Sequence, residues 1–141
     1  NIPVIQVSLP GSLDATTAYA FGKALAPLRS QGVLIVGSGS LTHNLYEFRR
    51  SPGEGDAQYA REFADWATQT VTSRDHDRLV RTMELAPHAA RAHPTTEHLL
   101  PLMIAAGPAG ADAPVHVLEG GITHGVLAMD SYVFGLEGYA A

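Results

Sequence analysis

The sequence contains no cysteine among its 141 residues. Disulfide frameworks, thiolate nucleophiles and cysteine-bound metals are therefore excluded. Basic residues are also scarce, with 9 Lys and Arg against 14 Asp and Glu, which gives a formal net charge of −5. Because nucleic acids and anionic membranes are bound by concentrated positive charge, the sequence argues against both kinds of partner.

Long apolar runs are missing as well. Stretches such as Val33–Val36 and Leu99–Ala106 are far shorter than the ~20 residues that span a bilayer. No charged-then-apolar leader stands at the start, so we expect a cytoplasmic protein. The chain opens at Asn1 directly on an apolar segment, and we expect that sequence preceding it has been lost.

What the chain does contain is typical of one globular domain over residues 1–141. Hydrophobic residues make up 45% of the sequence and charged residues 16%. Its seven histidines stand out, because histidine is the residue most often used as a metal ligand or as a proton carrier near neutral pH.

The first third of the sequence predicts a βαβ unit. Ile2–Leu9 is rich in β-branched residues and ends at a Pro-Gly turn, and Val33–Val36 is a second apolar run. Between them, Ser12 or Asp14 can cap a helix whose apolar stripe is Ala18, Phe21, Leu25 and Leu28, with Pro27 distorting its last turn. Two parallel strands joined by a helix predict an α/β fold with a mixed, mainly parallel sheet flanked by helices.

The remaining chain predicts three further helices and two closing strands. A helix follows Asp56 with the stripe Tyr59, Phe63, Trp66 and Thr70; another follows Asp75; a third runs from Thr95 or Thr96 to Ala106; the strands are Val115–Leu118 and Val126–Phe134.

One candidate site is the glycine-rich loop of residues 37–44, just after the second predicted strand. Ligands in open α/β sheets bind at the carboxyl ends of strands, where glycines let the backbone approach a substrate. His43 is placed for proton transfer, although a histidine packed in the first turn of a helix gives the same pattern. The loop lacks the third glycine and the lysine of nucleotide-binding loops, so a nucleotide site has weak support.

A second candidate lies in residues 92–102. If Thr95 caps the following helix, His98 lies in its first turn, with His93 on the entering loop. Two histidines five residues apart match no standard zinc spacing, so the pattern alone slightly favours a turn residue at His93 and an ordinary surface histidine at His98. The other histidines are expected on the surface or in a loop: His76, His88, His116 and His124.

Three ordered segments closely resemble one enzyme family. They are Val33–Leu45 (VLIVGSGSLTHNL), Ala92–Leu102 (AHPTTEHLLPL) and Met129–Phe134 (MDSYVF), preceded by Leu25–Arg29. Together they are similar to the class III extradiol ring-cleavage dioxygenases, in the LigB-type branch that contains the 4,5-DOPA dioxygenases. The likeness covers essentially the whole chain but only the carboxyl-terminal half of that family.

The resemblance implies a role for each motif residue. His43 corresponds to the catalytic acid/base, within reach of the metal, and His98 to a metal ligand, with Glu97 as the alternative ligand. His93, Gly39 and Ser40 would face the substrate. The implied cofactor is Fe(II), with Zn(II) as the alternative, and the implied substrates are a catechol and O₂. The amino-terminal half of the family supplies two further metal-binding histidines, so a missing half or a partner chain is implied.

Three hypotheses of different classes follow. The first is the carboxyl-terminal half of a ring-opening dioxygenase, active only when completed. The second is a metal- or ligand-binding module of the same fold without catalysis. The third, a nucleotide-binding domain, depends on Gly37 and Gly39 alone. If the first holds, His43, His93 and His98 are expected to converge on one cleft.

Overall fold

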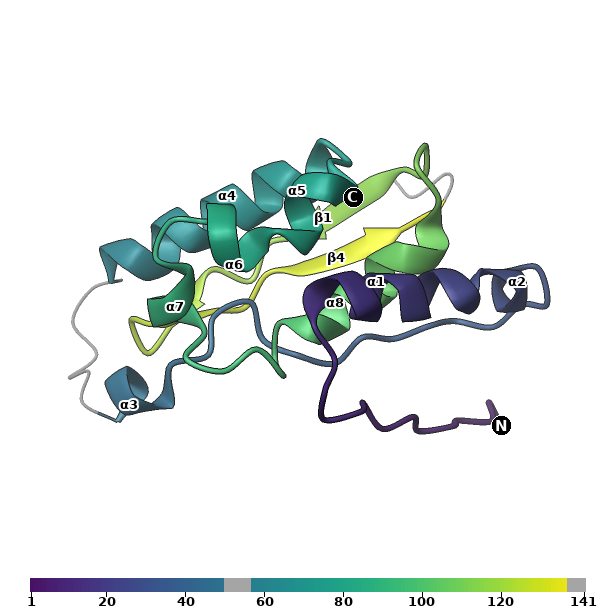
Figure 1. Cartoon of the computed structure of the whole chain (residues 1–141), viewed down its shortest axis with the longest axis horizontal. Coiled ribbons are helices and arrows are strands. Elements are labelled where there is room, and N and C mark those ends of the chain that lie inside the picture. The colour runs from purple at the N-terminus through teal and green to yellow at the C-terminus, as the bar shows by residue number, and fades with distance from the viewer. Residues whose placement is uncertain (50–56, 137–141) are drawn as a thin grey trace.

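The computed structural model describes residues 1–49 and 57–136, which form helices packed around short strands (Figure 1). The helices are α1 (Ala15–Ala24), α2 (Ala26–Arg29), α3 (Leu45–Phe48), α4 (Gln58–Thr72), α5 (His76–Val80), α6 (Thr82–Leu85), α7 (Ala89–Ala92) and α8 (Leu100–Ala106), which continues into the 3₁₀ turn η1 (Gly107–Ala109).

The strands form two antiparallel pairs. Strand β1 (Val115–Leu118) pairs with β4 (Ser131–Phe134), and β2 (Ile122–Thr123) pairs with β3 (Leu127–Ala128). The chain is therefore α/β, as expected, and the predicted strand Val115–Leu118 is confirmed as β1. The predicted strand Val126–Phe134 is divided into β3 and β4, which belong to different sheets. The expected mainly parallel sheet is wrong, because both sheets in the described part of the chain are antiparallel.

The two segments predicted as parallel strands, Ile2–Leu9 and Val33–Val36, are not strands in this structure. Figure 1 shows both as extended segments without helix or strand. Ile2, Ile5 and Leu34 are 90%, 87% and 83% exposed. Apolar β-branched sequence favours extended backbone, but a strand also needs a neighbouring backbone to accept and donate hydrogen bonds. Within residues 1–49 and 57–136 neither segment has such a neighbour.

Helix α1 begins where the sequence predicts but ends earlier, at Ala24. The side chain of Asp14 accepts a hydrogen bond from the Thr17 N–H at 2.7 Å, and the Thr17 hydroxyl accepts one from the Asp14 N–H at 3.0 Å. This capping box satisfies donors that the first helical turn cannot use. The helix stops at Ala24, and Pro27 lies in the separate short helix α2, so the predicted distortion is confirmed.

The core lies between α4, α8 and the strands. Phe63, Ala67 and Val71 form one face of α4 and are almost completely buried, together with Leu99 and Met103 from the start of α8. Helix α1 packs along α8, where Gly22 lies against the backbone of Ile104 with no room for a side chain. The predicted stripe of the α4 helix is confirmed at Tyr59, Phe63 and Thr70, while Trp66 is partly buried.

No helix among the described residues has the length and apolar character required to cross a lipid bilayer.

Candidate metal centre

Two segments far apart in the sequence, residues 40–44 and 91–98, are joined by backbone hydrogen bonds. The Ser40 N–H donates to the carbonyl oxygen of His98 at 2.9 Å, and the His43 N–H donates to that of Ala92 at 2.8 Å. Both bonds join backbone atoms, so this pairing is determined by the fold and not by the side chains. It fixes the backbone of His43 relative to His98.

His43 and His98 lie face to face. Their ring centroids are 3.6 Å apart with 28° between the ring planes. Glu97 completes the group: one ligand atom from each of His43, Glu97 and His98 falls within 4.8 Å of the others, and Glu97 Oε1 lies 3.9 Å from His98 Nε2. Two imidazoles and a carboxylate are the donor types that bind divalent transition metals.

The electrostatics of this cluster favour a bound cation. Partial burial lowers the pKa of His43, and the neighbouring His98 ring lowers it further, against an opposing effect of Glu97. The pKa of Glu97 is lowered by a 2.8 Å hydrogen bond from the Thr95 hydroxyl. Near neutral pH the site therefore presents a neutral imidazole and an ionised carboxylate, which are the protonation states that metal binding requires. The residues present fit a divalent metal ion.

His93 is buried beneath the glycine-rich loop. Only 1% of its surface is exposed, and its ring lies 5.4 Å from that of Phe63. Nε2 is 2.8 Å from the carbonyl oxygen of Leu41, so Nε2 carries the proton and donates it to this bond. Nδ1 is buried without a hydrogen-bond partner among the described residues. Burial lowers the pKa of His93, which keeps the ring neutral.

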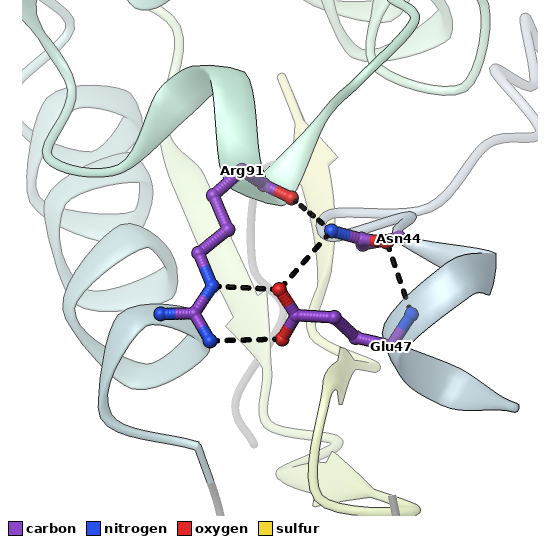
Figure 2. Close-up of polar contacts among 3 residues, drawn as sticks. All are labelled: Asn44, Glu47 and Arg91. Atoms are coloured by element: carbon purple, nitrogen blue, oxygen red, sulfur yellow. Dashed lines mark hydrogen bonds and ion pairs between the residues drawn. The ribbon is translucent and has the colours of Figure 1, made fainter. Parts of the chain in front are cut away.

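A side-chain network holds the other end of the loop (Figure 2). The Asn44 side chain accepts a hydrogen bond from the Glu47 N–H at 3.2 Å, which caps α3, and it donates to the Arg91 carbonyl oxygen at 2.8 Å. Arg91 in turn binds both carboxylate oxygens of Glu47, at 2.7 and 3.0 Å. The start of α3 and the end of α7 are thereby tied together beside His43.

Thr42 anchors the loop from within. Its hydroxyl donates to the Val126 carbonyl oxygen at 2.7 Å and accepts from the Ala128 N–H at 2.8 Å. Thr42 is completely buried. One hydroxyl thus satisfies two backbone groups of the segment that leads into β3, and it fixes the residue next to His43.

Gly37 and Gly39 allow the loop to lie directly on the start of α8. A side chain at Gly39 would overlap the carbonyl oxygen of His98, and one at Gly37 would overlap that of Pro101. The two glycines are explained by this close approach of two backbones. The Ser40 hydroxyl donates to the Thr42 carbonyl oxygen at 2.8 Å. That Gly39, Ser40 and His93 contact a substrate stays a prediction.

The structure brings His43 and His98 together but starts the helix later than predicted. Helix α8 begins at Leu100, and His98 lies in the preceding turn. The other histidines lie outside the cluster: His76 is near the Tyr19 ring, His88 pairs with Glu62 at 2.6 Å, His116 is on β1 and His124 contacts Phe48.

Sequence reasoning missed the residues that support the cluster. The spacing of Asn44 and Glu47 is that of a helix N-terminus and could have been recognised. Nothing in the sequence pairs Glu47 with Arg91, or Thr42 with the backbone of Val126 and Ala128, because these contacts depend on the tertiary fold.

Comparisons with known proteins give one consistent set of relatives. Residues 1–135 match the family described as the catalytic LigB subunit of aromatic ring-opening dioxygenase. The 4,5-DOPA dioxygenase extradiol of Beta vulgaris is 36% identical over 136 residues, which cover 95% of this chain and 50% of the relative. The protein of the same name from Escherichia coli K12 is 28% identical over 137 residues, covering 96% of this chain and 51% of the relative.

A solved structure shows the same relationship. The crystal structure of an uncharacterized protein from Escherichia coli K12 aligns with a TM-score of 0.75 at 28% identity, over 89% of this chain and 52% of that one. The chain spans about half the length of the curated relatives it matches.

Proposed function

Because the chain belongs to the LigB family of aromatic ring-opening dioxygenases, we propose that it forms part of an enzyme that opens the ring of a catechol-type substrate with O₂. The observation that carries the proposal is the cluster of His43, Glu97 and His98. Relatives named 4,5-DOPA dioxygenase extradiol support the extradiol position of cleavage.

The proposed cofactor is a non-haem Fe(II) ion held by His98, with His43 or Glu97 as a further ligand. Fe(II) would supply coordination positions for the substrate and the redox chemistry with O₂, which Zn(II) lacks. Two imidazoles and a carboxylate are the donors typical of non-haem iron oxygenases. Zn(II) would bind the same donors and give an inert form.

In this proposal His43 moves protons. Its lowered pKa leaves the ring unprotonated near neutral pH, so a ring nitrogen can accept a proton from a substrate hydroxyl and return it later. The backbone bond from His43 to Ala92 and the anchored side chain of Thr42 hold the ring in place while it does so. His93, buried and neutral, keeps the loop in position through Leu41.

The alternative is a metal-binding module without catalysis. One observation favours it: this chain spans about half the length of its relatives, so three donors in one cluster need not make a complete active site. We propose that further ligands come from a polypeptide portion outside this chain. The isolated chain is then expected to bind Fe(II) weakly and to open catechols poorly.

The test measures metal content together with oxygen uptake on a catechol. We expect the chain joined to the half of the Beta vulgaris relative that it does not match to bind Fe(II) and consume O₂. In that protein His98→Ala is expected to lose the metal. His43→Ala is expected to keep more of the metal and lose about 10²–10⁴-fold in turnover, the usual contribution of proton transfer.

His76→Gln is the matched control, because His76 lies outside the cluster, near Tyr19. Metal binding without oxygen uptake in the joined protein would favour the non-catalytic module. Unchanged metal content and turnover in both cluster variants would reject the site.

A further inference from the structure

A groove of about 400 Å³ lies between the extended segment 33–39 and strand β4. Side chains of α8, including Leu102 and Ala105, line it between these two walls. In Figure 1 the segment that follows α2 passes along one side of α8, and β4 lies along the other. The groove runs from Arg29 at the start of the segment to Gly39 and His98 at its end.

Both walls offer backbone groups without partners. Residues 34–39 make no backbone hydrogen bond to any other described residue. Strand β4 pairs with β1 along one edge, and no other described strand pairs with it. A groove between two extended backbones that each have an unpaired edge is the place where an added strand can hydrogen-bond on both sides.

The side chains along segment 33–36 are those of a buried strand. Leu34 and Val36 are 83% and 75% exposed, and Val33 is 44% exposed. No Asp, Glu, Lys or Arg occurs from Gln31 to Asn44, and His43 is the one titratable side chain in that range. Exposed contiguous apolar side chains of this kind mark an interaction surface.

The comparisons indicate what fills the groove. The superposition with the Escherichia coli structure covers 89% of this chain but only 52% of that one, so in that relative about half of the protein lies beyond the matched region. We propose that the groove receives an apolar β-strand from the portion of the dioxygenase fold that this chain does not span. The strand hydrogen-bonds to residues 34–37 on one side and to β4 on the other.

This position also connects the added strand to the metal cluster. His98 and Gly39 line the end of the groove, so a strand that fills it reaches the cluster. The inference rests on the proposed function for the identity of the partner. It names the surface through which the partner completes the site.

The experiment uses the whole chain, alone and joined by a flexible linker to the unmatched half of the Beta vulgaris relative. Tethering gives an effective concentration in the millimolar range. The two halves, which come from different organisms, are therefore expected to associate even if their affinity is weak. Hydrogen–deuterium exchange is measured at each amide. We expect at least tenfold slower exchange in the joined protein at the amides of residues 34–37 and 131–134 that face the groove, because paired amides exchange only when the local structure opens. The amides of β4 that already bond to β1 are expected to stay as they are.

Two leucine variants locate the contact. Leu34→Asp places a charge in the groove wall and is expected to abolish the added protection. Leu85→Asp is the matched control, since Leu85 is 42% exposed and does not line the groove. Because Leu34 is mostly exposed in this chain, its replacement leaves the chain's own core intact.

Three results would overturn the inference. The first is a joined protein without added protection at the two walls. The second is slow exchange at residues 34–37 in the isolated chain at every concentration, because these amides would then already be paired within the chain. The third is protection in the isolated chain that grows with its concentration, which assigns the groove to a second copy. Protection without oxygen uptake supports the docking surface and rejects the proposed function, whereas oxygen uptake without protection does the opposite.

Discussion

Replacing Thr42 by valine tests whether the loop that carries His43 is held by its buried hydroxyl. Valine has nearly the same shape, so the change removes the hydroxyl without leaving a cavity. The Val126 carbonyl and the Ala128 N–H, at 2.7 and 2.8 Å from the hydroxyl, then lose their partner in a buried place. An unsatisfied buried group costs about 1–3 kcal/mol, so the two together cost about 2–6 kcal/mol.

That loss is measurable by urea unfolding. With a slope of roughly 2 kcal/mol per molar urea, the unfolding midpoint is expected to fall by about 1–3 M. Thr70→Val is the matched control. Thr70 is also completely buried, but its hydroxyl has no hydrogen-bond partner among the described residues, so valine there is expected to be neutral or stabilising.

The comparison of the two variants can refute the reasoning. A free energy of unfolding for Thr42→Val within about 0.5 kcal/mol of the unchanged protein would show that the two backbone groups find other partners. Equal destabilisation by both variants would show that burial of any threonine, and not its hydrogen bonds, decides the outcome.

Two further predictions concern His93 and Gly39. Because the pKa of His93 in the folded chain is lowered from 6.5, only the unfolded chain takes up a proton as the pH falls below about 6.5, and the free energy of unfolding decreases from there downward. His93→Gln keeps a donor for Leu41 and is expected to flatten this pH dependence of the urea midpoint. An unchanged slope in His93→Gln would contradict the assignment. Gly39→Ala forces a side chain onto the His98 carbonyl oxygen, so we expect a loss of about 1–3 kcal/mol in the free energy of unfolding and weaker zinc binding by calorimetry. Gly11→Ala, which meets no atom within 4 Å, is the control, and equal effects of the two would reject the close-approach explanation.

The helices could be predicted wherever local chemistry determines them. Asp14 and Asp75 cap their helices as expected, and the buried face of α4 follows from its periodicity. The strand pairing could not be predicted in the same way. Ile2–Leu9 has the composition of a strand, but pairing is decided by a second backbone, and the sequence of one segment carries no information about it.

The candidate site shows the same division. Motif order and residue type pointed to His43 and His98, and the fold places their rings 3.6 Å apart. Whether they hold a metal stays a prediction. Spacing alone cannot separate the adjacent residues Glu97 and His98 as ligands; in the structure the Glu97 carboxylate joins the cluster. The burial of His93 depends on how α4 packs behind the loop, since Phe63 comes from that helix.

The uncharged apolar segments at residues 2–9 and 33–36 also bear on how copies of this chain associate with one another. Extended backbone with exposed valine and isoleucine is the form in which identical chains stack into intermolecular sheets. Protein sequences usually guard such edges with lysine or other charges, and neither segment contains one. Pro3 is the one residue in them that cannot donate to a growing ladder. We therefore expect the isolated chain to associate through these two segments as its concentration rises, even while the core around α4 and α8 stays folded.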